Sequence, residues 1–112
     1  MEKIKNAFPN TSILIISTAD KDYRYDGEWH TEKGVLPLTD VQYSLASDAG
    51  FDFLNLYNAM GGADAMRGWV EQDPPLANKD YTHVNHRGAT KLAGIIYKAI
   101  ADELYDFQKH DN

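Results

Sequence analysis

The chain has 112 residues, 43% of them hydrophobic and 25% charged, which is the composition of one ordinary globular domain or of part of one. Its net charge of −6, without any basic cluster, argues against a nucleic-acid partner. The absence of cysteine excludes disulfides and thiolate metal sites, and no apolar run reaches the roughly 20 residues that a membrane span needs.

The first residues, Met1–Ala7, predict the tail of a helix that Pro9 ends. A domain seldom starts on the tail of a helix, so we expect the chain to be a truncated part of a larger domain. The segment lacks the apolar core of a signal peptide. If the parent protein is secreted or periplasmic, its signal precedes Met1, and the compartment stays open.

A strand, a helix and a second strand follow in order. Ser12–Ser17 is a short apolar run without alternation, which favours a strand covered on both faces. Pro37–Ala49 repeats apolar residues at helical spacing and ends at Gly50. Phe51–Tyr57 predicts the second strand. Together they form a βαβ unit, so we expect the two strands to be parallel.

The segment between the first strand and the helix, Thr18–Leu36, has no clear periodicity. We expect a long loop at the carboxyl end of a parallel strand, where α/β folds place ligands. Its aromatic residues include Tyr25 and Trp29, which could form a platform for a sugar or an acyl group. Alternatively, both side chains pack onto the core. The sequence leaves these two interpretations open.

The second half of the chain predicts a short helix at Ala63–Val70, ended by Asp73-Pro74-Pro75, and a long amphipathic helix from Asn85 to about Phe107. Asn85 has the side chain of an N-cap. Between the proline-rich loop and the long helix, Asp80–Gly88 contains a carboxylate, two imidazoles and a guanidinium within nine residues.

Within this stretch, Asp80 and His83 are spaced to meet in a loop that runs into a helix. The carboxylate can accept Nδ1–H of the imidazole, which leaves Nε2 free to take a proton from a nucleophile. In the purely structural alternative, Asp80 caps a turn and His83 packs. Asp80, His83 and His86 also have a spacing that zinc ligands use, but no fourth ligand is near. We predict neither a metal nor a cofactor.

The run Lys79-Asp80-Tyr81-Thr82-His83-Val84-Asn85-His86-Arg87-Gly88-Ala89, followed by a long helix, resembles the block that ends the SGNH (GDSL-like) hydrolases. The resemblance extends from about Asn10 to Phe107. It implies an α/β fragment of a three-layer, flavodoxin-like parallel sheet, with two strands flanked by helices. Residues 1–112 would then be the C-terminal part of a single SGNH-hydrolase-like domain.

The resemblance also implies a function. Asp80 and His83 would be catalytic residues of a serine ester hydrolase, an acyl or acetyl esterase or a lipase-like enzyme whose substrates include carbohydrate esters. Tyr25, Trp29 and His86 are the candidates for contact with the substrate. The competing interpretation is a non-catalytic α/β module for binding or assembly.

Two blocks of the family are missing from this sequence, the Gly-Asp-Ser block with the nucleophile and the Gly-x-Asn-Asp block with oxyanion donors. Ser17 and Thr18 end the first strand, but neither lies in the turn that a nucleophile needs. We expect the Ser17 hydroxyl to bond to local backbone. We also expect an exposed sheet edge, which predicts self-association or pairing with the missing half of the domain.

Overall fold

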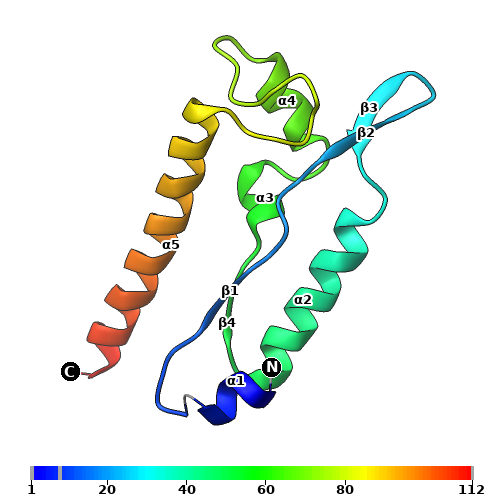
Figure 1. Ribbon diagram of the computed structural model, residues 1–112. Coiled ribbons are helices and arrows are strands. Elements are labelled where there is room, and N and C mark those ends of the chain that lie inside the picture. Colours follow the sequence, from blue (N-terminus) through cyan, green and yellow to red (C-terminus); the bar gives the residue numbers. More distant parts are fainter. Residues whose placement is uncertain (1, 8, 112) are drawn as a thin grey trace.

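The computed structural model describes residues 2–7 and 9–111 (Figure 1). The helices and strands follow in the order α1 (Glu2–Ala7), β1 (Leu14–Ile16), β2 (Asp22–Tyr25), β3 (Glu28–Thr31), α2 (Val35–Ala49), β4 (Asp52–Leu54), α3 (Leu56–Met60), α4 (Ala65–Glu71) and α5 (His86–Asp111).

The centre of the fold is a parallel pair of strands. β1 and β4 align with Leu14 opposite Asp52, Ile15 opposite Phe53 and Ile16 opposite Leu54. Helix α2 connects them and contacts β4, and the strands lie between α2 and α5 (Figure 1). The predicted α/β fold, a parallel two-stranded fragment flanked by helices, is confirmed.

The second strand is shorter than predicted, because β4 ends at Leu54 and not at Tyr57. The side chain of Asn55 accepts a hydrogen bond from the backbone N–H of Asn58 at 2.9 Å, which caps the start of α3. Leu56 and Tyr57 are therefore helical and buried. An apolar run shared by a strand and the following helix does not reveal where one ends.

The prediction of a long loop over Thr18–Leu36 is wrong in its middle, where β2 and β3 form an antiparallel hairpin. The two-residue turn consists of Asp26, with φ 52°, and Gly27, with φ 82°. Positive φ at both positions is the signature of a type I′ turn, which Asp-Gly favours. The hairpin projects from the carboxyl end of β1 (Figure 1).

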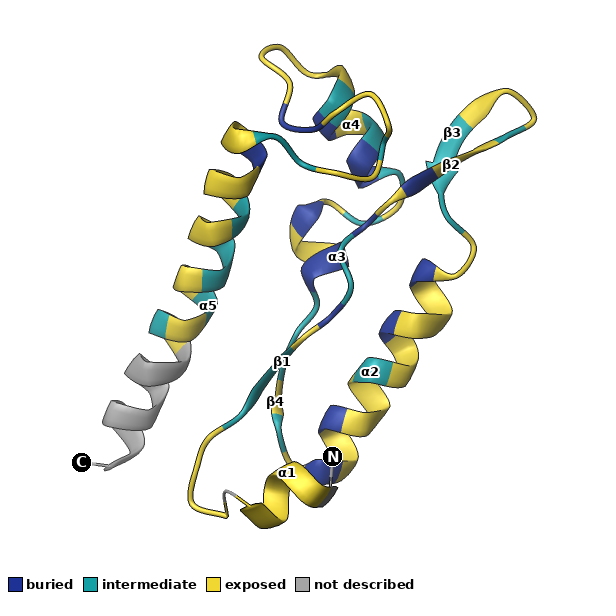
Figure 2. Ribbon diagram, in the orientation of Figure 1, coloured by how far each residue is buried: buried dark blue, intermediate teal, exposed yellow. Residues whose placement is uncertain are grey.

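The main cluster of buried side chains lies beyond the sheet, among α3, α4 and the start of α5 (Figure 2). Trp69 on α4 is 4% exposed, and its indole N–H donates to the carbonyl of Met60 at 3.0 Å. The cluster comprises Leu56, Met60, Ala65, Met66, Trp69, Leu76 and Ala77. It supports the loop that carries the candidate dyad, since Leu76 and Ala77 begin that loop.

The sheet end of the molecule leaves much apolar surface in solvent. The accessible surface is 7729 Å², whereas a compact monomer of 12.6 kDa exposes about 6,200 Å². The radius of gyration is 16.2 Å, against about 13 Å for a compact domain of this length. The exposed large apolar residues include Ile16 on β1, Leu36, Leu38, Val41, Tyr43 and Leu45 on α2, and Tyr97 and Ile100 on α5.

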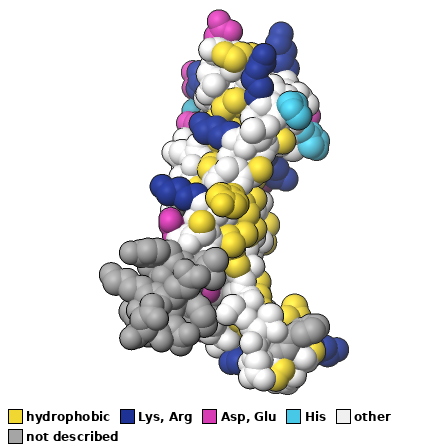
Figure 3. Space-filling view, turned by 90° about the vertical axis from the view of Figure 1, so that its left-hand side faces the viewer, with side chains coloured by type: hydrophobic (Ala, Val, Ile, Leu, Met, Phe, Trp, Pro, Cys, Tyr) yellow, Lys and Arg dark blue, Asp and Glu magenta, His cyan; other side chains and the backbone are white. Residues whose placement is uncertain are grey.

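Figure 3 views the side on which α5 lies and shows hydrophobic side chains along the length of this face. None of the helices in the described part of the chain is both long and apolar enough to cross a membrane.

Candidate active site

Asp80 and His83 are in direct contact. Oδ2 of Asp80 lies 2.7 Å from Nδ1 of His83, and Oδ1 accepts the backbone N–H groups of Thr82 at 2.9 Å and His83 at 3.0 Å. The backbone N–H of His83, the imidazole of His83 and the N–H of Thr82 lower the pKa of Asp80 to about 2. The carboxylate is thus ionised at neutral pH, so it selects the imidazole tautomer with hydrogen on Nδ1 and leaves Nε2 free.

The loop around the dyad is held by its own backbone. The N–H of Asn78 donates to the carbonyl of His83 at 2.8 Å, and the N–H of Asn85 donates to the carbonyl of Leu76 at 3.0 Å. A β-bridge pairs Ala77 with Val84. The two ends of the loop are therefore joined, and the dyad lies on a closed and ordered turn.

Asn85 is the cap of α5, as predicted. Its Oδ1 accepts the N–H of Gly88 at 3.0 Å, and its Nδ2 donates to the carbonyl of Pro75 at 2.8 Å. A side chain on Gly88 would overlap the carbonyl oxygen of Leu76, so only glycine fits where the helix meets the loop. The sequence from Asn85 to Gly88 thus fixes how α5 leaves the dyad.

The dyad is open to solvent. The side chain of His83 is 74% exposed and that of Asp80 48%, so a nucleophile and a substrate can reach Nε2. His86 is exposed in the first turn of α5, three residues further along. Among the side chains that the structure describes, those of residues 3–7 and 9–102, no group of three or more histidine or carboxylate side chains is arranged to hold a metal ion.

The two aromatic candidates lie in different settings on the hairpin. Trp29 stacks on Tyr81, next to Asp80 in the chain, with ring centroids 3.9 Å apart and planes at 8°. Tyr25 lies near the turn, and its hydroxyl accepts the backbone N–H of Lys33 at 3.0 Å. The hairpin therefore brings Trp29, and not Tyr25, to the loop of the dyad.

Ser17 is buried at the end of β1, with 4% exposure. Its hydroxyl accepts the N–H of Leu56 at 2.8 Å and donates to the carbonyl of Thr18 at 3.0 Å. The bond to Thr18 is the local backbone bond that the sequence predicts, whereas the bond from Leu56 comes from the start of α3, 39 residues further along the chain. A hollow lined by Lys5, Thr11, Gly50 and Asp52, among others, lies at the opposite, amino end of the strands.

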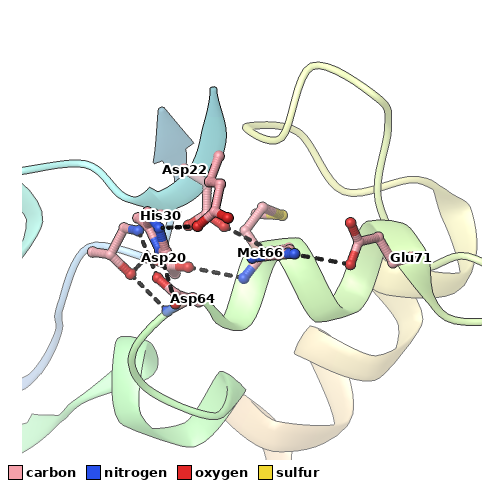
Figure 4. Close-up of polar contacts among 9 residues, drawn as sticks. Asp20, Asp22, His30, Asp64, Met66 and Glu71 are labelled. Carbon is pink, nitrogen blue, oxygen red and sulfur yellow. Dashed lines mark hydrogen bonds and ion pairs between the residues drawn. The ribbon is translucent and has the colours of Figure 1, made fainter. Parts of the chain in front are cut away.

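A buried polar cluster, which the sequence did not reveal, joins the hairpin to α4 (Figure 4). Asp20 is 1% exposed, accepts the hydroxyl of Thr31 at 2.9 Å and accepts the N–H of Met66 at 2.8 Å. Asp64 accepts the N–H of Thr31 at 3.0 Å, and its Oδ2 lies 3.1 Å from Nδ1 of His30. The hydrogen bond to Asp64 raises the pKa of His30, and the N–H of Thr31, followed by His30, lowers the pKa of Asp64.

Asp22 is the second buried carboxyl group of this cluster, with 4% exposure. Its Oδ2 accepts the N–H of Arg67 at 2.9 Å, while its buried Oδ1 has no hydrogen-bond partner among the described residues. Burial, followed by the neighbouring carboxyl group of Asp20 and its charge, raises the pKa of Asp22 to about 7. Below that pH the protonated Asp22 can donate from this oxygen, which removes the cost of burying it without a partner.

Two solved structures share this fold. One is a peptidoglycan O-acetylesterase, with 21% sequence identity and a TM-score of 0.80 over 94% of this chain and 30% of that one. The other is the esterase domain of the ORF1 protein from the zebrafish ZfL2-1 retrotransposon, with 18% identity and a TM-score of 0.58 over 89% of this chain and 55% of that one.

No protein-family profile matches the sequence, and the comparison with curated proteins finds no similar sequence. The chain spans about a third of the first esterase and about half of the second. It therefore has the fold of a part of each of these two esterase structures, in agreement with the expected α/β fragment.

Proposed function

We propose that this chain is the Asp/His-bearing part of a serine ester hydrolase. The observation that carries the proposal is the contact of 2.7 Å between Asp80 and the Nδ1 of an exposed His83, in a fold shared with esterases. His83 would take the proton of a serine hydroxyl through Nε2 and return it to the leaving alcohol. Asp80 would hold the ring and stabilise the imidazolium that forms between the two steps.

The nucleophile and the oxyanion donors would come from polypeptide outside residues 1–112. Ser17 is buried and occupied by backbone bonds, and the sequence has no Gly-Asp-Ser block. The excess accessible surface of roughly 1,500 Å² over a compact monomer is as large as an extensive protein interface. In our proposal, residues 1–112 are the C-terminal part of one SGNH-hydrolase-like domain, and the nucleophile-bearing half covers this apolar surface.

The substrate we propose is an acyl ester, and specifically an acetyl ester of a carbohydrate. Support comes from the peptidoglycan O-acetylesterase that shares the fold and from the aromatic hairpin beside the dyad. His86, exposed in the first turn of α5 and three residues after His83, would contact such a substrate. Trp29 could contribute an edge, since one of its faces is occupied by Tyr81.

A non-catalytic module for binding or assembly is the second candidate. The exposed apolar side chains of α2 and α5 are compatible with it, since they would serve a partner surface in either case. The state of His83 separates the two candidates, because only a catalytic base needs a free Nε2.

The test is ¹⁵N NMR of the histidine rings above pH 8, in the wild type and in Asp80→Asn. We expect His83 to carry its hydrogen on Nδ1 in the wild type and to lose this preference in the variant, while exposed His86 stays unchanged. A His83 that favours hydrogen on Nε2 in the wild type would refute the assignment.

Hydrolysis of p-nitrophenyl acetate supplies the second readout. We expect the wild type and His83→Ala to share the same background rate, since a triad without its serine is slower by roughly 10⁶. Hydrolysis that His83→Ala abolishes and His86→Ala preserves would place a nucleophile within this chain and overturn the divided site.

A further inference from the structure

The β2–β3 hairpin contacts the loop of the dyad at two points. The backbone N–H of Asp22 donates to the carbonyl of Tyr81 at 2.9 Å, and the Trp29 ring stacks flat on the Tyr81 ring. Tyr81 directly follows Asp80. The hairpin therefore holds the residue on which the turn between Asp80 and His83 is built.

Tyr81 has an unusual backbone conformation, with φ 58°. A non-glycine residue in the left-handed region costs roughly 1–2 kcal/mol, and it persists only where the surroundings hold it. This conformation lets the chain turn back, so that the N–H groups of Thr82 and His83 both reach Oδ1 of Asp80. The geometry of the dyad thus depends on Tyr81 staying in this region.

The hairpin is itself fixed at its base. The buried carboxylates of Asp20 and Asp22 accept the N–H groups of Met66 and Arg67 at the start of α4. Thr31 at the end of β3 is bonded to Asp64, just before the same helix. These bonds tie the hairpin to the buried cluster around Met66 and Trp69, so it can transmit a rigid constraint (Figure 4).

We propose that the β2–β3 hairpin is a positioning element for the Asp80–His83 pair, and that Trp29 is its positioning residue, which holds Tyr81 in the left-handed conformation. This inference rests on the proposed function, because holding the Asp80–His83 pair serves catalysis only if the pair is catalytic. None of the described hydrogen bonds joins Trp29 to Asp80 or to His83. It acts on them through the ring and backbone of Tyr81.

The readout is the pKa of Asp80, followed by NMR of its carboxyl carbon. In the wild type, the backbone N–H of His83, the imidazole of His83 and the backbone N–H of Thr82 lower the pKa of this carboxyl group to about 2. In Trp29→Ala, the turn relaxes and these donors leave, so we expect the pKa of Asp80 to rise by about one unit or more towards its ordinary value. Trp29→Phe retains a flat ring, so we expect the pKa of Asp80 in this variant to stay close to its wild-type value.

The matched control is Tyr23→Ala. Tyr23 lies on the same hairpin and is 60% exposed, and its ring contacts Tyr25, away from the dyad. We expect this variant to leave the pKa of Asp80 unchanged. The indole N–H signal of Trp69, bonded within the core, reports whether each variant remains folded.

A pKa of Asp80 within 0.3 unit of the wild type in a folded Trp29→Ala chain would overturn the proposal. If Trp29→Ala does not fold, Trp29→Leu decides, because it keeps apolar bulk but loses the flat stack, and the same rise is expected. The readout does not require ester hydrolysis. If the pKa of Asp80 does not rise, the hairpin has no positioning role, but the esterase assignment still stands. If instead His83 carries its hydrogen on Nε2, the esterase assignment is refuted, but the contact between the hairpin and Tyr81 still stands.

Discussion

Replacing Asp22 with asparagine should stabilise the protein at neutral pH. The ordinary pKa of this carboxyl group is 3.8, and burial beside Asp20 raises it to about 7 in the folded chain. Between these values the folded chain keeps a proton that the unfolded chain has released. The free energy of unfolding therefore falls as the pH rises from about 4 to about 7, and the group adds no further change above that.

The magnitude follows from the width of this interval. About three pH units at 1.36 kcal/mol each give at most about 4 kcal/mol of lost stability at pH 7.5. Asparagine can donate through Nδ2 to Asp20 and accept the N–H of Arg67 through Oδ1, so it reproduces the protonated carboxyl group. We expect Asp22→Asn to equal the wild type near pH 4 and to exceed it by up to about 4 kcal/mol at pH 7.5.

The assay is urea unfolding, followed by far-ultraviolet circular dichroism, between pH 4 and 8 at one protein concentration, since association would add stability. His30 and Asp80 also have shifted pKa values, but both chains share these groups, so their contributions cancel in the difference. Asp26→Asn removes an exposed carboxylate from the turn of the hairpin and should change stability by less than about 0.5 kcal/mol. A difference between Asp22→Asn and the wild type that does not vary with pH would refute the reasoning.

Two further substitutions test the junction of α5 and the open apolar surface. Gly88→Ala should lose about 1–3 kcal/mol in urea unfolding, because its Cβ would overlap the carbonyl oxygen of Leu76. Gly94→Ala places a Cβ in open space on the same helix, so its free energy of unfolding should rise by about 1 kcal/mol. Equal changes in the free energy of unfolding for the two variants would contradict the steric argument. Because of its exposed apolar surface, the wild-type chain should self-associate in light scattering, and Val41→Lys, at a position 55% exposed on α2, should reduce the mean mass. A monomeric wild type at micromolar concentration would count against the partner surface.

The elements that the sequence predicted correctly are those with a local signal. The long helix has its apolar stripe and the cap at Asn85, and the parallel strands have short apolar runs separated by a helix. The spacing of Asp80 and His83 allows the two groups to meet on one turn, and in the structure they lie 2.7 Å apart. Each of these signals lies within a few residues of the feature that it predicts.

The sequence does not show the hairpin as a pair of strands, because its one buried position, Asp22, is polar. Asp22 is buried on β2 and Tyr23 beside it is exposed, so the usual alternation of apolar inside and polar outside is inverted. Asp22 finds its partner, the N–H of Arg67, 45 residues away. The one local signal in this segment is the Asp26-Gly27 pair, since Asp-Gly favours the type I′ turn of a two-residue hairpin.

This contrast bears on how far a short motif can predict a site. Asp80 and His83 are near in sequence, yet the turn between them requires Tyr81 at a positive φ, which its own side chain disfavours. The contacts that hold Tyr81 come from Asp22 and Trp29, more than 50 residues earlier. An Asp-x-x-His sequence without such a support would relax, and its carboxylate would lose the backbone donors that keep it ionised. The motif is therefore informative only where the rest of the fold supplies that constraint.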